Sequence, residues 1–152
     1  MDQALSQERI DYLKKDYDQG FITYCGFKAG KIDHGRFDSF VEIKEHHRQQ
    51  DGFIHAGVMA TMADHTAGYA AFTVVDPTFQ ILSIEFKINF MKPAFGKRLE
   101  CCSKVLRPGR KIIVSESEIF DIRDGKRVLT AKATVTLMPV ERESLVSQNK
   151  HI

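Results

Sequence analysis

Alternating apolar and polar residues mark most of the second half of the chain as strands. Two sets of residues between 78 and 91 are predicted to fall on opposite faces of one strand: Leu82, Ile84, Phe86, Ile88 and Phe90 on the first, and Ser83, Glu85, Lys87 and Asn89 on the second. Three further strands are predicted at about 98–106, 111–122 and 127–138, and the last two are joined by Asp124-Gly125, a strong hairpin signal. This half of the chain therefore predicts an antiparallel sheet.

The first half of the chain begins with a helical spacing. Four apolar residues recur on one helical face: Leu5, Ile10, Leu13 and Tyr17. Gly20 stands where a C-terminal cap would stand, so we expect an N-terminal helix within residues 1–20. Two extended segments follow, at about 25–33 and 36–44, with a tight turn at His34-Gly35 between them.

The central segment, residues 53–75, contains no lysine or arginine, and Asp64 is its only carboxylate. Its alanines and methionines favour a helix, and no proline interrupts it. A helix that is apolar on nearly every face is a buried one. A membrane span is disfavoured, because a central aspartate flanked by His55 and His65 would be costly in lipid. We therefore expect a core helix that stops at Asp76-Pro77 and holds Asp64 inside.

The predicted order of elements is one helix, two strands, a buried helix and four strands. An antiparallel sheet can bury a single long apolar helix on more than one side only by curling around it. The expected architecture is thus an α+β hotdog fold, in which a curled antiparallel sheet of about six strands wraps around one central helix, with an extra N-terminal helix.

Length and composition agree with a single domain, residues 1–152. Of these 152 residues 43% are hydrophobic and 28% are charged, and the net charge of +2 does not predict nucleic-acid binding. We expect a core at about 24–140 and a polar, frayed tail at 141–152. No apolar N-terminal run resembles a signal peptide, and the three cysteines have neither a disulfide nor a metal spacing. Free thiols fit a reducing compartment, so a cytoplasmic protein is predicted.

The adjacent His46 and His47 are the one pattern that suggests a metal. They lie in a polar run, residues 45–52, and no third ligand stands at a useful spacing. Because metal sites need three or four convergent ligands, we expect a solvated loop and no metal.

Three blocks of sequence resemble the PaaI-type hotdog thioesterases. The first is Gly52-Phe53-Ile54-His55-Ala56-Gly57-Val58 followed by Asp64, which is similar to the family's Gly-x-x-His-Gly-Gly…Asp signature. The second, residues 83–94, is similar to the family's third strand, and the third comprises Gly109-Arg110, Asp121 and Gly125-Lys126. The resemblance covers about residues 27–138. It implies hydrolysis of acyl-CoA thioesters by dimers or dimers of dimers, without a metal or an organic cofactor.

The resemblance also implies roles for individual residues. Asp64 matches the general base or nucleophile, and the backbone N–H of Ala56, with that of Gly57 beside it, matches the site that polarises the thioester carbonyl. Gln49 stands where the family has an asparagine that helps to hold water or substrate, and Ser83 matches a serine near the attacking water. Two positions depart from the family. Ala56 replaces a glycine, which preserves the donor only if φ is negative, and Gln49 is one methylene longer than asparagine.

Within one chain, helix geometry keeps the Ala56 N–H and the Asp64 carboxylate of this predicted site far apart. A helix start offers unpaired N–H groups and a partial positive charge to an oxyanion, and a poorly solvated carboxylate is a good base. Ala56 and Asp64, eight residues apart, are separated by about 12 Å along a helix. Reacting atoms must approach to about 3 Å. If both act on one thioester, Asp64 must therefore meet the helix start of a second subunit across a two-fold axis.

Each predicted site residue has a plainer structural alternative. Asp64 is either the base or a hydrogen-bonding partner of a neighbouring strand, and His55 is favoured as a structural residue at the start of the helix over an acid or base. Ser83 is either solvated or catalytic, and Arg107 and Arg110 either lie free at the surface or bind CoA phosphates.

For the whole chain we predict a cytoplasmic acyl-CoA thioesterase that forms a homodimer or a tetramer. One rival interpretation is a non-catalytic acyl-CoA-binding sensor with the same fold. A hotdog hydratase is a third, for which no additional His-Asp pair is visible. Cleavage of a thioester separates the enzyme from the sensor.

Overall fold

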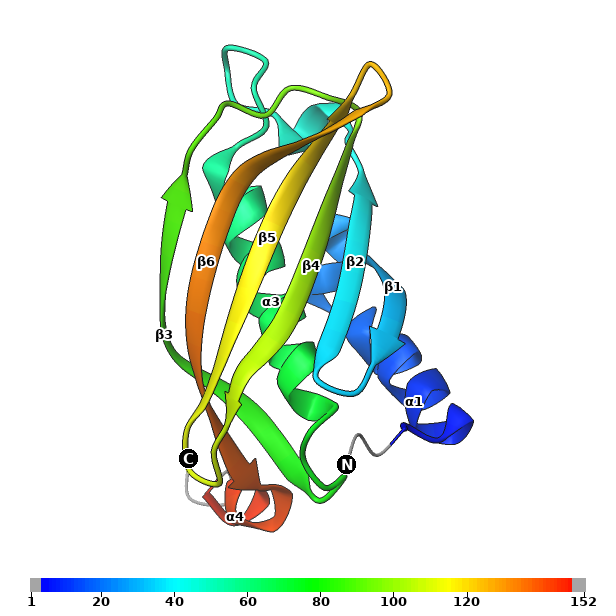
Figure 1. Cartoon of the computed structure of the whole chain (residues 1–152), viewed down its shortest axis with the longest axis vertical. Coiled ribbons are helices and arrows are strands. Elements are labelled where there is room, and N and C mark those ends of the chain that lie inside the picture. Colours follow the sequence, from blue (N-terminus) through cyan, green and yellow to red (C-terminus); the bar gives the residue numbers. More distant parts are fainter. Residues whose placement is uncertain (1–3, 149–152) are drawn as a thin grey trace.

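The structure is a computed structural model that describes residues 4–148 as one six-stranded antiparallel sheet with four α-helices. The strands run in the order β1-β2-β4-β5-β6-β3 across the sheet (Figure 1). They are β1 (Lys28–Asp33), β2 (Arg36–Glu42), β3 (Phe79–Phe90), β4 (Arg98–Pro108), β5 (Ile113–Arg123) and β6 (Lys126–Glu141). The helices are α1 (Gln7–Tyr17), α2 (Phe21–Cys25), α3 (Ala56–Phe72) and α4 (Arg142–Gln148), with a 3-10 turn at Glu45–His47.

The central helix α3 lies along one face of the sheet, and α1 lies beside it near β1 (Figure 1). Alanines at 63, 67, 70 and 71 are buried, so the sheet can approach the helix closely. Inward side chains of the central strands, such as Leu99, Ile119 and Val135, complete the core. The predicted α+β hotdog fold with its extra N-terminal helix is confirmed.

The helix α3 is shorter than the predicted segment 53–75. It begins at Ala56, because Ile54 forms an isolated antiparallel bridge with Arg48. It ends at Phe72, ahead of Asp76-Pro77. The Thr73 hydroxyl donates to the Ala70 carbonyl at 2.6 Å, so a polar side chain closes the last turn before the proline is reached.

The residues that follow α1 differ from the prediction. Gly20 does not cap that helix; it is the N-cap of α2, and Phe21–Cys25 are helical instead of leading into the first strand. Gly26, at φ 79°, ends α2, and β1 then begins at Lys28. The polar tail is also more ordered than predicted, because residues 142–148 form α4, whose Arg142 N–H donates to the Thr78 carbonyl at 3.0 Å. The last part of the predicted frayed tail, 149–152, lies outside the described residues.

A β-bulge interrupts the alternation predicted for β3. Ser83 pairs with the buried Leu137 of β6, and the register then shifts by one, so that Ile84 is an extra residue. Directly opposed residues share a face of the sheet. Ser83 therefore points toward α3, on the same face as Phe86, which pairs with the buried Val135. The prediction that these two residues lie on opposite faces is wrong.

Candidate active site

The first turn of α3 presents a backbone donor. His55 is the N-cap of the helix, and its Nδ1 accepts a hydrogen bond from the Gly57 N–H at 2.8 Å. Of the two predicted oxyanion donors, the Gly57 N–H is therefore engaged, whereas the Ala56 N–H has no acceptor within residues 4–148. Ala56 is a helical residue with negative φ, so the alanine keeps the donor that a glycine would provide.

The loop before α3 fixes the side chain of Gln49. Its Oε1 accepts from the Asp51 N–H at 2.7 Å, and its carbonyl accepts from the Gly52 N–H at 3.0 Å. Because a backbone N–H only donates, the amide oxygen must be the atom that faces Asp51. The Nε2 group of Gln49 is thus left to donate elsewhere.

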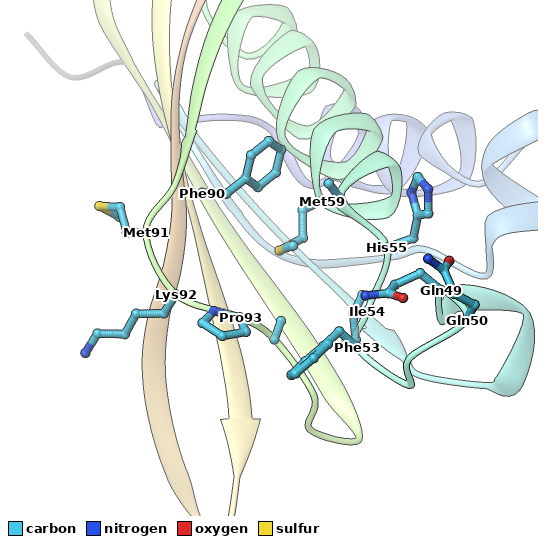
Figure 2. Close-up of a pocket in the computed structure, with 12 residues that line it drawn as sticks. Gln49, Gln50, Phe53, Ile54, His55, Met59, Phe90, Met91, Lys92 and Pro93 are labelled. Carbon is cyan, nitrogen blue, oxygen red and sulfur yellow. The ribbon is translucent and has the colours of Figure 1, made fainter.

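Gln49, His55 and Ala56 line a pocket of about 450 Å³ (Figure 2). One wall comes from residues 49–56 and the other from residues 90–94, and Met59 of α3 lies between them. Most of the lining side chains are apolar: Phe53, Ile54, Met59, Phe90, Met91, Pro93 and Ala94. The pocket can therefore hold an apolar group next to a free backbone donor.

Asp64 lies about two helical turns further along α3, and it does not line this pocket. The Ser83 hydroxyl donates to Asp64 Oδ1 at 2.6 Å. The predicted burial of Asp64 is wrong for a single chain, because its side chain is half-buried. The structure thus brings Asp64 together with Ser83, and Gln49 together with His55 and Ala56, but it leaves the two groups apart.

Arg107 and Arg110 are exposed residues at the connection of β4 and β5, at the opposite end of the sheet from the start of α3 (Figure 1). Arg110 lines a separate, mostly apolar cavity of about 300 Å³ together with Phe79 and Pro139. In one chain, neither arginine lines the pocket beside Ala56.

His47 is a structural residue that the sequence did not reveal. It is buried, its Nδ1 accepts from the Lys44 N–H at 2.9 Å, and its Nε2 donates to the Cys25 carbonyl at 2.6 Å. Burial lowers the pKa of this imidazole. Its backbone carbonyl accepts from the His55 N–H at 2.9 Å, so His47 supports the start of α3. The predicted solvated loop is wrong at this position.

Two absences hold for the part of the chain that the structure describes. Within residues 4–148, no three His, Cys, Asp or Glu side chains are grouped so that they could hold a metal ion. Over the same residues, no helix is long and apolar enough to cross a membrane.

Comparisons with known proteins identify relatives of this chain. Residues 51–128 match the family described as "Thioesterase superfamily". A protein of Saccharolobus solfataricus named "Putative esterase SSO2140" is 36% identical over 124 residues, which are 82% of this chain and 85% of that protein. The "1,4-dihydroxy-2-naphthoyl-CoA hydrolase" of Listeria monocytogenes is 22% identical over 102 residues, 67% of this chain and 83% of that protein.

A solved structure agrees with these sequence matches. The crystal structure of a thioesterase family protein from Silicibacter pomeroyi is 30% identical and has a TM-score of 0.84, covering 88% of this chain and 98% of that one. The family match contains α3 and β3, and with them Ala56, Asp64 and Ser83. The chain belongs to the thioesterase superfamily.

Proposed function

We propose that the protein hydrolyses acyl-CoA thioesters to a free acid and CoA, as a PaaI-type member of the superfamily. The observation that carries this proposal is the free Ala56 N–H at the positively polarised start of α3, which adjoins an apolar pocket. Such a donor stabilises the oxyanion that forms when a thioester carbonyl is attacked. The name of the Listeria relative, a CoA thioester hydrolase, supports the same substrate class.

Asp64 supplies the base or the nucleophile in this proposal. Ser83 holds one carboxylate oxygen at 2.6 Å and leaves the other to act. As a base, Asp64 takes a proton from water while the water oxygen bonds to the carbonyl carbon. The carbon–sulfur bond then breaks, and the CoA thiolate leaves and is protonated. As a nucleophile, the carboxylate attacks the carbonyl carbon itself, the carbon–sulfur bond breaks, and the CoA thiolate leaves and is protonated. Water then hydrolyses the resulting anhydride between the acyl group and Asp64, which releases the acid and restores the carboxylate.

Ala56 and Asp64 act on one thioester only if they come from two subunits, and the flank of α3 that faces β3 is suited to that contact. Four residues at helical spacing remain at least partly exposed: Gly57, Thr61, Asp64 and Gly68. Three of them are small, so a second copy of α3 can approach closely in the antiparallel direction. Such a pairing places Asp64 of one chain beside Ala56 of the other.

The edge strand β3 supports the same assembly. Ile84, Phe86 and Phe90 are 52%, 41% and 46% exposed, although two of them lie on the face of the sheet that meets α3. A long edge strand with exposed apolar side chains is a pairing surface. We infer a homodimer in which the β3 edges and the α3 flanks meet, and two dimers can associate to a tetramer.

The other predicted residues complete the proposed site. The free Nε2 of Gln49 donates to the substrate or to the attacking water, and His55 holds the helix start and lines the pocket. The two-fold symmetry of an antiparallel pair brings the far end of one sheet toward the helix start of the partner. Arg107 and Arg110 are proposed to meet the CoA phosphates there.

Release of free thiol from a series of acyl-CoA esters of increasing chain length tests the proposed function. We expect hydrolysis with a preference for acyl groups that fill the apolar pocket. Binding of acyl-CoA without release of thiol would identify a non-catalytic sensor instead. A chain that neither binds nor cleaves any member of the series would overturn the proposal.

A further inference from the structure

Arg48 ties together the two loops that form the walls of the pocket. Its Nη1 donates to the Gly52 carbonyl at 2.9 Å and to the Phe95 carbonyl at 3.3 Å, and its Nη2 donates to the Gly96 carbonyl at 3.0 Å. Gly52 belongs to the loop before α3, and Phe95 and Gly96 belong to the loop that follows β3. One half-buried guanidinium therefore binds three carbonyl oxygens on opposite sides of the pocket.

Asp121 of β5 holds the same loop from the other side. Its carboxylate is fully buried and accepts from the Phe95 N–H and from the Gly96 N–H, both at 3.0 Å. The Nε of Arg123 lies 3.3 Å from this carboxylate and offsets its charge. The backbone at Phe95 and Gly96 is thus held by a cation at its carbonyl oxygens and by an anion at its N–H groups.

The residue type at position 96 follows from this arrangement. A Cβ on Gly96 would lie 2.3 Å from Asp121 Oδ1 and 2.3 Å from the Ile122 carbonyl oxygen. No side chain fits there unless the loop moves away from Asp121. The loop is therefore seated closely against the end of β5.

The pocket lies next to this clamp of Arg48, Asp121 and Gly96. The Ile54 N–H donates to the Ala94 carbonyl at 2.8 Å, so the two walls are joined one residue away from Phe95. Both Ile54 and Ala94 line the pocket. Figure 2 shows Ile54 on one wall and Pro93, the neighbour of Ala94 in the chain, on the other. A shift of the loop at 95–96 moves the second wall relative to the first.

We propose that Arg48 is a positioning residue that fixes the width of this pocket and thereby its selection among acyl groups. The role rests on the proposed acyl-CoA hydrolysis and assigns a determinant of substrate choice to a side chain that does not line the pocket. Arg48 acts through the loop it binds, because its donors are directed at backbone carbonyls. A wall that is free to move accommodates neighbouring acyl lengths almost equally, whereas a fixed wall distinguishes them.

Two matched substitutions test the proposal, Arg48→Met and Arg36→Met. Each removes a guanidinium and keeps an unbranched stem, but Arg36 is an exposed residue of β2 whose partner is Asp38 at 3.2 Å. Hydrogen exchange of residues 92–97 reports the loop, and kcat and KM over the acyl series report the pocket. Arg48→Lys, which keeps a charge with fewer directed donors, serves as a partial rescue and as the test variant if Arg48→Met does not fold.

For Arg48→Met we expect faster exchange at Phe95 and Gly96 and a higher KM for the acyl group that fits best. Because one methylene in a pocket changes kcat/KM by about 10-fold or more, the preference between neighbouring chain lengths should fall by about 10-fold. The loss should fall on KM more than on kcat. Arg48→Lys should lie between this variant and the wild type, and Arg36→Met should match the wild type.

Three results would overturn this role. Exchange and chain-length preference equal to those of Arg36→Met would show that Arg48 does not hold the wall. A uniform loss of kcat for every acyl group would make Arg48 a general structural residue. A wild-type chain that cleaves no thioester would remove the proposed function and the selection role with it, while the exchange measurement would still report whether Arg48 holds the loop.

Discussion

The two flanks of α3 carry similar polar side chains but differ in what covers them. On the flank toward α1, the Thr66 hydroxyl lies 3.1 Å from Tyr17 Oη and 2.8 Å from Ser39 Oγ, and all three residues are buried. Tyr69 Oη also donates to Asp16 at 2.8 Å. On the flank toward β3, called the open flank below, Asp64 has one side-chain hydrogen-bond partner, Ser83, and its side chain stays partly exposed.

Asp64 and His65 are adjacent in the sequence but lie on different flanks of α3. His65 is held on the α1 flank, where its Nε2 donates to the Tyr17 carbonyl at 3.1 Å and its ring lies 4.5 Å from the Tyr17 ring. Asp64, one residue earlier, is on the open flank. A polar residue with buried, paired neighbours stabilises the fold, whereas a half-buried carboxylate next to an unpaired edge strand is available for chemistry with a second subunit.

Substitution of Asp64 and of His65 should therefore have opposite consequences. Asp64→Asn keeps the shape and an oxygen for Ser83 but cannot accept a proton, so we expect kcat to fall by about 10²–10⁴ with little change in Tm or in the Kd for acyl-CoA. His65→Gln should lower the free energy of unfolding by about 1–3 kcal/mol and leave kcat per folded molecule near that of the wild type. If Asp64→Asn lowers Tm but keeps the kcat of the wild type, Asp64 has a structural role and not a catalytic one.

A proline at position 56 removes the proposed oxyanion donor without removing the helix. Proline is favoured at the first helical position, and His55 has the extended backbone that a following proline needs, at φ −63° and ψ 136°. Ala56→Pro should lower kcat by about 10²–10³, the usual cost of one oxyanion donor, with little change in Tm. A proline variant with full kcat would exclude the Ala56 N–H from the mechanism.

Mixing Ala56→Pro with Asp64→Asn asks whether one site uses both subunits. Each heterodimer then contains one site with an intact Asp64 from one chain and an intact Ala56 from the other. Random exchange of subunits should restore about a quarter of the wild-type activity, because half of the dimers are mixed and one of their two sites is complete. No recovery after proven subunit exchange would place Ala56 and Asp64 in separate roles.

The sequence predicted those features that depend on residues close together in the chain. Alternation identified the strands, and Asp124-Gly125 forms the predicted hairpin, with φ 49° and 71° at the two residues. Features set by distant partners escaped prediction. The bulge at Ile84 depends on the register with β6, and the burial of His47 depends on the Cys25 carbonyl.

The candidate site divides in the same way. The motif around His55 and Ala56 was visible because its residues are adjacent, and the order of Asp64 after them could be counted along a helix. The engagement of the Gly57 N–H by His55 was not visible, since it depends on the rotamer of the capping ring. Asp121 belongs to the third block of the family resemblance, but the sequence did not show which groups it binds. No pattern indicated Arg48, because it meets Asp121 only through the backbone of a third segment.

Substitution of Arg107 and Arg110, at the connection of β4 and β5, should lower activity less than substitution of Asp64 or Ala56. If Arg107 and Arg110 of one chain meet the CoA phosphates, replacing both by alanine should raise the KM for acyl-CoA by about 10-fold, since charge-assisted contacts at exposed positions are weak. The kcat should change little, and a small thioester without a nucleotide should be hydrolysed as by the wild type. An unchanged KM and an unchanged salt dependence of the KM would show that neither arginine binds CoA.

The smallest expected effect is that of pH on the free energy of unfolding, and it should come from His65 and His47. Burial lowers the pKa of His65, although its hydrogen bond to the Tyr17 carbonyl and the charges of Asp64 and Asp16 oppose this shift. Burial also lowers the pKa of His47. Both imidazoles are thus favoured as neutral in the folded chain. In the unfolded chain they take up a proton at about pH 6.5.

The stabilisation from the two neutral histidines should therefore be complete above about pH 6.5 and be lost as pH falls through their lower folded-state pKa values. The slope can reach at most about 1.4 kcal/mol per pH unit for each histidine. Denaturant unfolding between pH 7.5 and 5 should show it, and His65→Gln should remove the part that belongs to the α1 flank. His46→Gln, at an exposed neighbour of His47, is the matched control. If the free energy of unfolding still depends on pH to the same extent after replacement of both His47 and His65, other groups cause that dependence. The two neutral imidazoles would then not be its source.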